Sequence, residues 1–379
     1  MQNNRFLPFT RRDCFALGLG GAVAACAPGG VKQPGSQGLR DIARAKGRDF
    51  GSCLGGAAFR DDRVREIMAR ECGVLVPENE MKWAALRPDP ASFDFAAADA
   101  LVDFAEANRM RLRGHTLFWM DSQWFPAWLN EYDFGTRPAS EAERLLRDHI
   151  RTVCGHYGER VFSYDVVNEA IEPKTGALRD NALTRHLGDA VIDIAFDAAR
   201  QAAPHAELVY NDFMSWGPGN AAHREGVTRL LHELAGRGVP VGALGVQGHI
   251  GPGASDTTPE FGADDEAQWR KFLDSAVALG LDIVITELDV GDQHLPGDVS
   301  ERDDAVAALT RKYLDVMLSY PQTRYVMTWG LTDKYSWLRE RWPREDGLPK
   351  RPCPYDDDYQ PKAMREAIAD AFRAAPARA

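Results

Sequence analysis

The sequence predicts an α/β protein built as a single (β/α)8 (TIM) barrel. After residue 40, short apolar runs alternate with amphipathic helical patterns, the order that builds a parallel sheet through crossover helices. The 379 residues suit this fold, since such barrels take roughly 250 to over 400 residues. No internal linker or low-complexity segment divides residues 41–379, so we expect one domain there.

The predicted strands and helices alternate eight times along the chain. Strands are expected at residues 50–57, 74–77, 111–117, 161–167, 207–210, 243–247, 283–286 and 325–329. Amphipathic helices follow them at residues 62–72, 96–108, 141–157, 189–203, 221–237, 265–279, 300–318 and 362–373. A strand followed by a helix, repeated eight times, is the element order of a closed barrel.

A doubly wound sheet is the competing α/β architecture. Its usual signature is a glycine-rich phosphate turn of the form G-x-G-x-x-G that opens the first helix. Residues 51–56 are glycine-rich but lack this order, and no Walker lysine follows them. We therefore interpret these glycines as room for close backbone approach beside a ligand cleft.

Composition and charge exclude several classes of protein. The 44% hydrophobic and 27% charged residues are typical of a globular chain. The net charge of -11 opposes a phosphate backbone, so nucleic acid is not a predicted partner. Six cysteines, with no C-x-x-C pair, are too few for a disulfide scaffold. Cys53, Cys72, Cys154 and Cys353 lie on different predicted elements, and the sequence leaves their disulfide state open.

Residues 1–25 are predicted to be an export signal. Arg11 and Arg12 precede a mildly apolar run, similar to a twin-arginine signal. Residues 23–26 resemble a lipobox, which makes Cys26 a candidate lipid anchor, and an ordinary cleavage site at residues 22–24 is the alternative. Residues 26–40 then form a flexible tether. We expect a periplasmic or envelope-anchored lipoprotein, or alternatively a secreted protein.

Polar and aromatic side chains gather where the predicted strands end. The carboxyl ends of barrel strands share one face, which carries the chemistry of such folds. Seven of the eight runs deliver such residues there, in order Glu78, Asn79 and Lys82; His115 and Trp119; Asn168 and Glu169; Asn211 and Asp212; Gln247 and His249; Glu287 and Asp289; Trp329 and Trp337. We expect them to converge on one cleft.

Two of these residues, Glu169 and Glu287, place carboxyl groups on the fourth and seventh strands of one closed barrel. Burying two ionised carboxylates is costly, so one must be protonated or a cation must lie between them. In a metal site, Glu169, Glu287, Asp289 and His249 would be ligands, although the intervening Asn, Gln and Trp are poor ones. In a glycosidase, one carboxylic acid protonates the leaving oxygen while the other acts at the anomeric carbon.

The glycosidase interpretation also accounts for the aromatic residues. Trp119, Trp329 and Trp337 are then platforms for the apolar faces of sugar rings, and the amides are partners for hydroxyl groups. This interpretation requires no metal and no cofactor.

Five segments resemble glycoside hydrolase family 10, the endo-1,4-β-xylanases. They are residues 78–83 (ENEMKW), 113–117 (RGHTL), 165–169 (DVVNE), 286–289 (TELD) and 329–337 (WGLTDKYSW). The resemblance runs in order from about residue 40 to residue 375 and so covers nearly all of residues 41–379, the predicted catalytic domain. It implies a retaining (β/α)8 barrel.

Site roles follow from this resemblance. It implies Glu169 as the general acid/base and Glu287 as the nucleophile, with His249 and Asp289 orienting and polarising Glu287. Asn168 would hold the 2-hydroxyl of the reacting sugar. The residues that resemble the substrate-binding positions on the non-reducing side are Glu78, Asn79, Lys82, His115, Trp119, Gln247, Trp329 and Trp337.

Two departures from the family pattern bear on the subsites. The family usually follows the Trp of the third strand with His-Ser-Gln and then Pro, whereas Trp119 is followed by residues 120–126 (MDSQWFP) in a longer loop. Phe213 stands where the family has a tyrosine, which removes a hydroxyl on the leaving-group side. The loop at residues 251–266 can also reshape the cleft.

The sequence therefore predicts a monomeric retaining endo-1,4-β-xylanase that hydrolyses internal bonds of xylan and binds xylo-oligosaccharides. We expect the negative charge of Glu287 to raise the proton affinity of Glu169 until Glu287 becomes an ester. Two alternatives stay open. One is a non-hydrolytic lipoprotein that binds xylo-oligosaccharides, and the other is a hydrolase of β-1,4-glucans on the same barrel.

Overall fold

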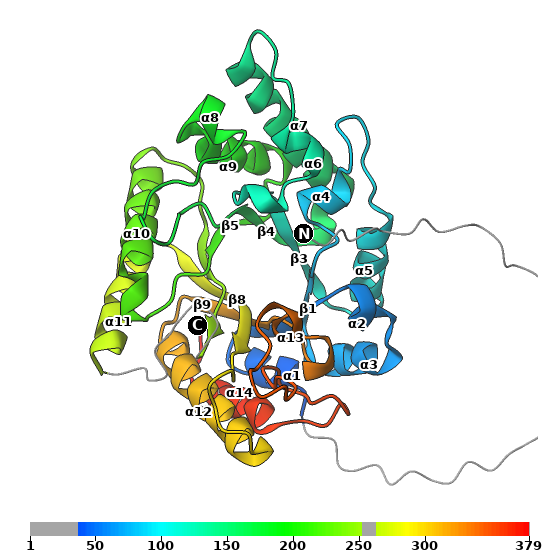
Figure 1. The fold of residues 1–379 in the computed structure, drawn as a ribbon, viewed down its shortest axis with the longest axis vertical. Helices are drawn as coiled ribbons and strands as arrows, with labels where there is room; N and C mark the ends of the chain where they lie inside the picture. Colours follow the sequence, from blue (N-terminus) through cyan, green and yellow to red (C-terminus); the bar gives the residue numbers. More distant parts are fainter. Residues whose placement is uncertain (1–36, 252–262, 379) are drawn as a thin grey trace, which may run out of the picture. The chain divides into compact units, whose positions relative to one another are not determined.

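Eight parallel strands close into a barrel in the computed structural model, which describes residues 37–251 and 263–378 (Figure 1). The strands are β1 (Asp49–Leu54), β2 (Val74–Pro77), β3 (Arg111–Trp119), β4 (Val161–Asn168), β5 (Glu207–Asp212), β6 (Ala243–Val246), β8 (Asp282–Val290) and β9 (Thr323–Thr328). Each pairs with its neighbour in this order, and β1 pairs with β9 to close the ring. The predicted (β/α)8 fold is confirmed.

Two strands end three or more residues away from their predicted ends. The first strand ends at Leu54 rather than at residue 57, because Gly56 begins the short helix α2 (Gly56–Arg60). β8 is longer than predicted and continues to Val290. Its extension pairs with an additional two-residue strand, β7 (His249–Ile250), which the sequence did not predict. The predicted export signal and Cys26 lie outside the described residues.

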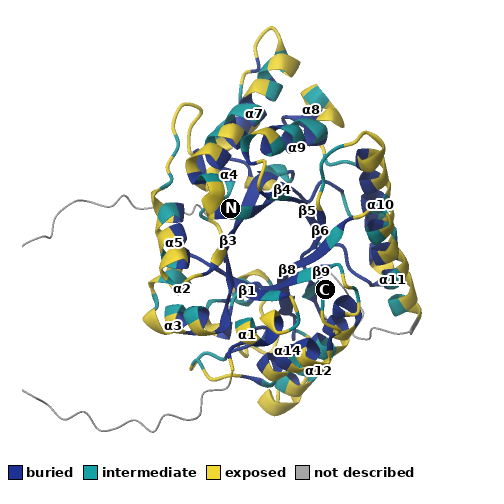
Figure 2. Cartoon of the chain, turned by 180° about the vertical axis from the view of Figure 1, so that it is seen from behind, coloured by how far each residue is buried: buried dark blue, intermediate teal, exposed yellow. Residues whose placement is uncertain are grey.

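Helices surround the strands with their buried faces turned inward and their exposed faces turned outward (Figure 2). The long ones are α3 (Asp62–Glu71), α5 (Ala96–Ala107), α7 (Pro138–Tyr157), α9 (Ala190–Ala202), α10 (Ala221–Gly236), α11 (Ala263–Ala278), α12 (Val299–Leu318) and α14 (Ala363–Ala374). Short ones are α1 (Leu39–Arg44), α4 (Trp83–Leu86), α6 (Ala127–Asn130), α8 (Thr184–Leu187) and α13 (Leu338–Arg341). Within the described ranges, no helix has the length and apolar character needed to cross a membrane.

Alternate strand side chains point into the barrel and away from it. The outward ones join the helices in the main core, as Leu75 does. The inward ones form a smaller core of Cys53, Val74, Val76, Val209, Ala243, Val284, Tyr325, Met327 and Trp329. Gly51 is required here, because a Cβ atom on it would collide with the backbone carbonyl oxygen of Val74.

A buried ion pair also occupies the barrel interior. The Arg113 guanidinium donates to Asp165 Oδ1 at 2.6 Å and to Ser163 Oγ at 3.2 Å. The second oxygen of Asp165 lies 3.0 Å from His115 Nδ1. This charged cluster thus supports His115 from below, at the end of the barrel where the polar strand-end residues lie.

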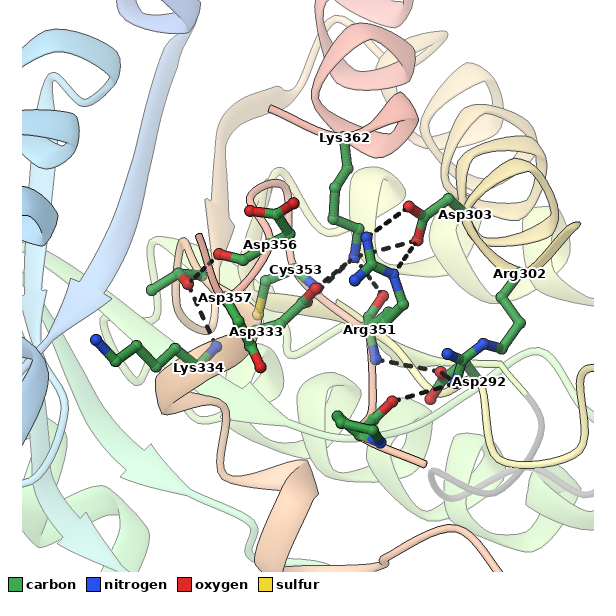
Figure 3. A network of polar contacts seen from close by, with 12 residues as sticks. Asp292, Arg302, Asp303, Asp333, Lys334, Arg351, Cys353, Asp356, Asp357 and Lys362 are labelled. Atoms are coloured by element: carbon green, nitrogen blue, oxygen red, sulfur yellow. Dashed lines mark hydrogen bonds and ion pairs between the residues drawn. The ribbon is translucent and has the colours of Figure 1, made fainter. Parts of the chain in front are cut away.

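Polar contacts tie the segment after β9 to its surroundings (Figure 3). The Lys362 ammonium donates to both oxygens of Asp333, at 3.1 and 2.9 Å, and to the carbonyl of Arg351 at 2.7 Å. Arg351 in turn forms a two-bond pair with Asp303 of α12, at 2.8 and 2.7 Å. Because Asp333 lies shortly before Trp337, this network holds the backbone that presents Trp337.

The cysteines of the described residues form no disulfide. Cys53, Cys72, Cys154 and Cys353 are all buried and free. Their thiols therefore contribute to the apolar core as small side chains.

Candidate active site

A cleft of about 450 Å³ opens at the carboxyl ends of the strands. Twelve of the thirteen predicted site residues line it: Glu78, Asn79, Lys82, His115, Trp119, Asn168, Glu169, Gln247, His249, Glu287, Trp329 and Trp337. The thirteenth, Asp289, is buried and contacts His249. Asn211 and Asp212, which were also expected at the cleft, are buried and do not line it. In the described part of the chain, no group of three or more His, Cys, Asp and Glu side chains is arranged to hold a metal ion.

Glu169 follows the last residue of β4 in a backbone conformation that is uncommon for a residue other than glycine. Its φ angle is 55°, in the left-handed region, and its N–H donates to the carbonyl of Asn211 at 2.8 Å. The turn directs the carboxyl group toward the cleft, where Gln247 Nε2 donates to Oε1 at 2.9 Å. Such local strain is typical of functional sites.

Burial raises the pKa of Glu169 to about 7, and the negative charge of Asp212 adds to this effect. Gln247 and the Trp119 indole act in the opposite direction. The charge of Glu287 also raises this pKa, but it is the smallest of the causes. The expected contribution of the Glu287 charge to the proton affinity of Glu169 is therefore present, but burial and Asp212 contribute more.

The surroundings of Glu287 lower its pKa and keep it ionised. Asn211 Nδ2 donates to Glu287 Oε1 at 2.9 Å, and His249 Nε2 lies 3.3 Å from Oε2. Burial raises the pKa of Glu287, but these two donors, together with the charges of His115 and His249, outweigh it and lower the pKa. Glu287 thus stays ionised while Glu169 holds its proton.

Asp289 and His249 form a relay behind Glu287. His249 Nδ1 lies 2.9 Å from Asp289 Oδ1, and Trp337 Nε1 donates to Asp289 Oδ2 at 2.7 Å. Burial lowers the pKa of His249, but Asp289 and Glu287 outweigh it and raise the pKa to about 10. The imidazolium therefore donates through both ring nitrogens, one to each carboxylate.

Asn211 links Asn168, next to Glu169, with Glu287. Asn211 Nδ2 donates to Asn168 Oδ1 at 2.8 Å as well as to Glu287, and Thr286 Oγ1 donates to Asn211 Oδ1 at 2.7 Å. The Nδ2 atom of Asn168 is buried without a hydrogen-bond partner among the described residues. This amide is a donor that a bound ligand can satisfy.

Lys82 lies among the cleft side chains. Its ammonium donates to Asn79 Oδ1 at 2.8 Å and lies 4.8 Å from the ring centroid of Trp119. Burial lowers the pKa of Lys82, whereas the carboxylates of Glu287 and Glu78 raise it. Burial also raises the pKa of Glu78 to about 6. This wall of the cleft therefore carries a positive charge among carboxyl groups.

Trp119 was expected to be a sugar platform, but its ring is already in contact with protein side chains. Besides Lys82, it stacks on Trp124 with ring centroids 4.8 Å apart and an interplanar angle of 14°. Trp124 belongs to the unusual loop at residues 120–126, and 46% of its surface is exposed. The freely exposed aromatic surface in this part of the cleft is therefore that of Trp124.

Sequence reasoning did not select several residues that line the cleft. These are Asp121, Gln123, Trp124, Arg179, Arg341 and Trp342. Arg179 lies on a hairpin after β4 and pairs with Asp121 (3.1 Å) and Glu172 (3.5 Å). None of the six follows a strand directly, so the strand-end criterion could not find them. The altered loop at 120–126 was the one available signal. Phe213, predicted as a departure from the family pattern, also lines the cleft.

Comparisons with known proteins agree with this geometry. The profile of Glycosyl hydrolase family 10 matches residues 38–371. The chain is 33% identical over 352 residues to Endo-1,4-beta-xylanase 5 of Pyricularia oryzae, covering 91% of this chain and 81% of that protein. It is 32% identical over 312 residues to Endo-1,4-beta-xylanase B of Thermotoga neapolitana, covering 82% and 83%.

Solved structures give the same result. The crystal structure of xylanase 10B from Thermotoga petrophila in complex with xylobiose superposes with a TM-score of 0.78 at 31% identity, covering 90% of this chain and 98% of that one. Native xylanase 10B from Thermotoga maritima superposes with a TM-score of 0.78, also at 31% identity, covering 88% and 98%.

Proposed function

The chain belongs to glycosyl hydrolase family 10 and is a retaining endo-1,4-β-xylanase, and we propose that Glu169 and Glu287 carry out its reaction. These roles are supported by the surroundings of the two carboxyl groups in one cleft, which shift their pKa values in opposite directions. The pKa of Glu169 is raised to about 7, whereas the pKa of Glu287 is lowered. A proton donor and an anionic nucleophile are the two groups that double displacement requires.

In the first step, Glu287 attacks the anomeric carbon of the sugar while Glu169 gives its proton to the departing glycosidic oxygen. The bond between Glu287 and the sugar forms as the glycosidic bond breaks. The result is a covalent ester on Glu287. Asn211 and His249 hold the Glu287 carboxylate in one orientation for this attack.

In the second step, the Glu169 carboxylate takes a proton from water, and the resulting hydroxide attacks the same carbon and releases Glu287. Two displacements restore the original anomeric configuration. Burial and the charge of Asp212 act on Glu169 in both steps, because neither depends on whether Glu287 is esterified. Glu169 therefore keeps a proton affinity suited to both donation and acceptance near neutral pH.

We assign the other cleft residues predicted from the sequence to substrate binding. The unpartnered amide of Asn168 is placed to donate to the 2-hydroxyl of the reacting sugar. Glu78, Asn79, Lys82, His115, Trp119, Gln247, Trp329 and Trp337 provide polar and aromatic contacts for xylan and xylo-oligosaccharides. His249 and Asp289 orient and polarise Glu287.

Substrates with different leaving groups separate the two carboxyl roles. A dinitrophenyl xylobioside needs no acid to leave, so Glu169→Gln should still form the ester and release a burst of dinitrophenol, whereas Glu287→Ala should release none. Both variants should lose hydrolysis of xylohexaose. Unchanged xylohexaose hydrolysis in either variant would contradict these roles, and binding without turnover by the wild-type chain would favour the binding-protein alternative. Parallel rates on aryl xylosides and aryl glucosides test the β-1,4-glucan alternative.

We further propose that residues 1–25 direct export and that Cys26 is acylated. The proposal rests on the paired arginines at 11 and 12 and on the small residues before Cys26. Cell fractionation of the full chain tests it: the wild type should be in the membrane fraction, and Cys26→Ala should be exported but soluble. Equal distribution of the two proteins would contradict acylation.

A further inference from the structure

The cleft wall carries a cation without an acidic partner in the part of the chain that the structure describes. Arg341 is the last residue of α13, is exposed, and lines the cleft beside Trp337 and Trp342. Its guanidinium carbon lies 5.6 Å from the ring centroid of Trp342. No carboxylate of the described residues forms an ion pair with it, so its charge is available to a ligand.

The other basic side chains of the cleft differ from Arg341 in this respect. The Lys82 ammonium is engaged by Asn79 at 2.8 Å. Arg179 is held by Asp121 at 3.1 Å. Either of these cations would have to give up an existing hydrogen bond or ion pair to meet a charged ligand, whereas Arg341 forms no ion pair within the described residues.

Arg341 is presented from a well-anchored segment. Trp337 and Trp342 pack edge to face with ring centroids 5.2 Å apart. Within α13, Arg339 pairs with Asp357 at 2.9 Å. The backbone that carries Arg341 is thus held by its neighbours on both sides.

The charge of the protein makes this cation significant. The chain has a net charge of -11, and the cleft contains the ionised Glu287. An acidic saccharide is repelled by this field unless a local cation compensates for it. A guanidinium fork matches the two oxygens of a carboxylate, and a neighbouring indole suits the apolar face of a sugar ring.

We propose that Arg341, together with Trp342, recognises a carboxylate carried by the xylan chain, that is, a uronic acid branch. The ion pair would make acidic xylan a preferred substrate over neutral xylan. This inference rests on the proposed function, because the branch reaches Arg341 only when the xylan backbone occupies the cleft.

A pair of substrates that differ only in charge tests the proposal. One is a xylo-oligosaccharide with a single glucuronic acid branch, and the other is the same compound with its carboxyl group reduced to an alcohol. The wild type should favour the acidic compound in kcat/KM by about 1.5- to 5-fold, the range of an exposed ion pair. Arg341→Gln should bring the ratio to about one, Arg341→Lys should retain most of it, and added salt should reduce it.

Arg137→Gln is the matched control, since Arg137 is also exposed but does not line the cleft. It should keep the wild-type ratio, and all variants should hydrolyse unbranched xylohexaose at the wild-type rate. A ratio of one in the wild type, or an undiminished ratio in Arg341→Gln, would overturn the inference.

Calorimetric binding of both compounds gives the same ratio without turnover. If xylohexaose is not hydrolysed but the binding preference depends on Arg341, the proposed function fails while the recognition of the carboxylate stands.

Discussion

Replacing Asp212 by Asn tests the origin of the acid/base behaviour of Glu169. Burial and the Asp212 charge are the two largest causes that raise the pKa of Glu169 to about 7. Asn keeps the shape of the side chain but removes the charge. The pKa of Glu169 should therefore fall, and the alkaline limb of the kcat/KM profile should move to lower pH.

The size of this effect follows from the ranking of the causes. Burial is the larger cause and is unchanged in Asp212→Asn, so part of the rise should remain in this variant. We expect the alkaline limb to move down by about one pH unit, which corresponds to ~1.4 kcal/mol. The acidic limb, which reports Glu287, should stay in place.

The assay is the pH dependence of kcat/KM on xylohexaose, which reports the pKa values of the free enzyme. Tyr210→Phe is the control, because the Tyr210 hydroxyl donates to Asp212 at 2.5 Å but carries no charge near neutral pH. That variant should keep the alkaline limb near pH 7. An alkaline limb that stays near pH 7 in Asp212→Asn would refute the assignment of this effect to Asp212.

Three further variants address other parts of the molecule. His249→Asn removes a cationic donor from Glu287, so the pKa of Glu287 should rise. The acidic limb of the kcat/KM profile should then move up by about one pH unit. An unmoved limb would contradict the role of His249 in keeping Glu287 ionised. Trp124→Ala removes an exposed ring from the cleft. It should raise KM for xylohexaose by about 2- to 10-fold with little change in KM for xylotriose. Equal effects on both substrates would exclude a subsite at Trp124. Lys362→Met leaves Asp333 buried without its partner and should lower the free energy of unfolding by about 3 kcal/mol in denaturant titrations; a loss below ~1 kcal/mol would show that the network in Figure 3 contributes little.

Much of the fold could be predicted from the sequence because the barrel repeats one simple pattern. Buried parallel strands read as short apolar runs, and the helices outside them read as amphipathic stretches. The two-residue strand His249–Ile250 is too short to show any periodicity. It is defined only by its pairing with β8, about 40 residues further along the chain. Such a strand is visible only in three dimensions.

The main site residues could be predicted for a related reason. Glu169 and Glu287 directly follow or end apolar runs, so the position of each along its strand predicts the face on which it lies. Trp124, Arg179 and Arg341 reach the cleft through loops whose paths depend on tertiary packing. The two larger causes of the raised pKa of Glu169, burial and the charge of Asp212, were not predicted because they have no local signal in the sequence.

A mechanism-based label would decide the roles of the two carboxyl groups. A 2-deoxy-2-fluoro xylobioside with an activated leaving group slows the second displacement and should leave a fluoroxylobiosyl ester on the protein. Mass spectrometry of peptides from the labelled wild-type chain should find this ester on Glu287. An ester on another residue, or inactivation without any ester, would contradict the assignment of Glu287 as the nucleophile and Glu169 as its acid partner.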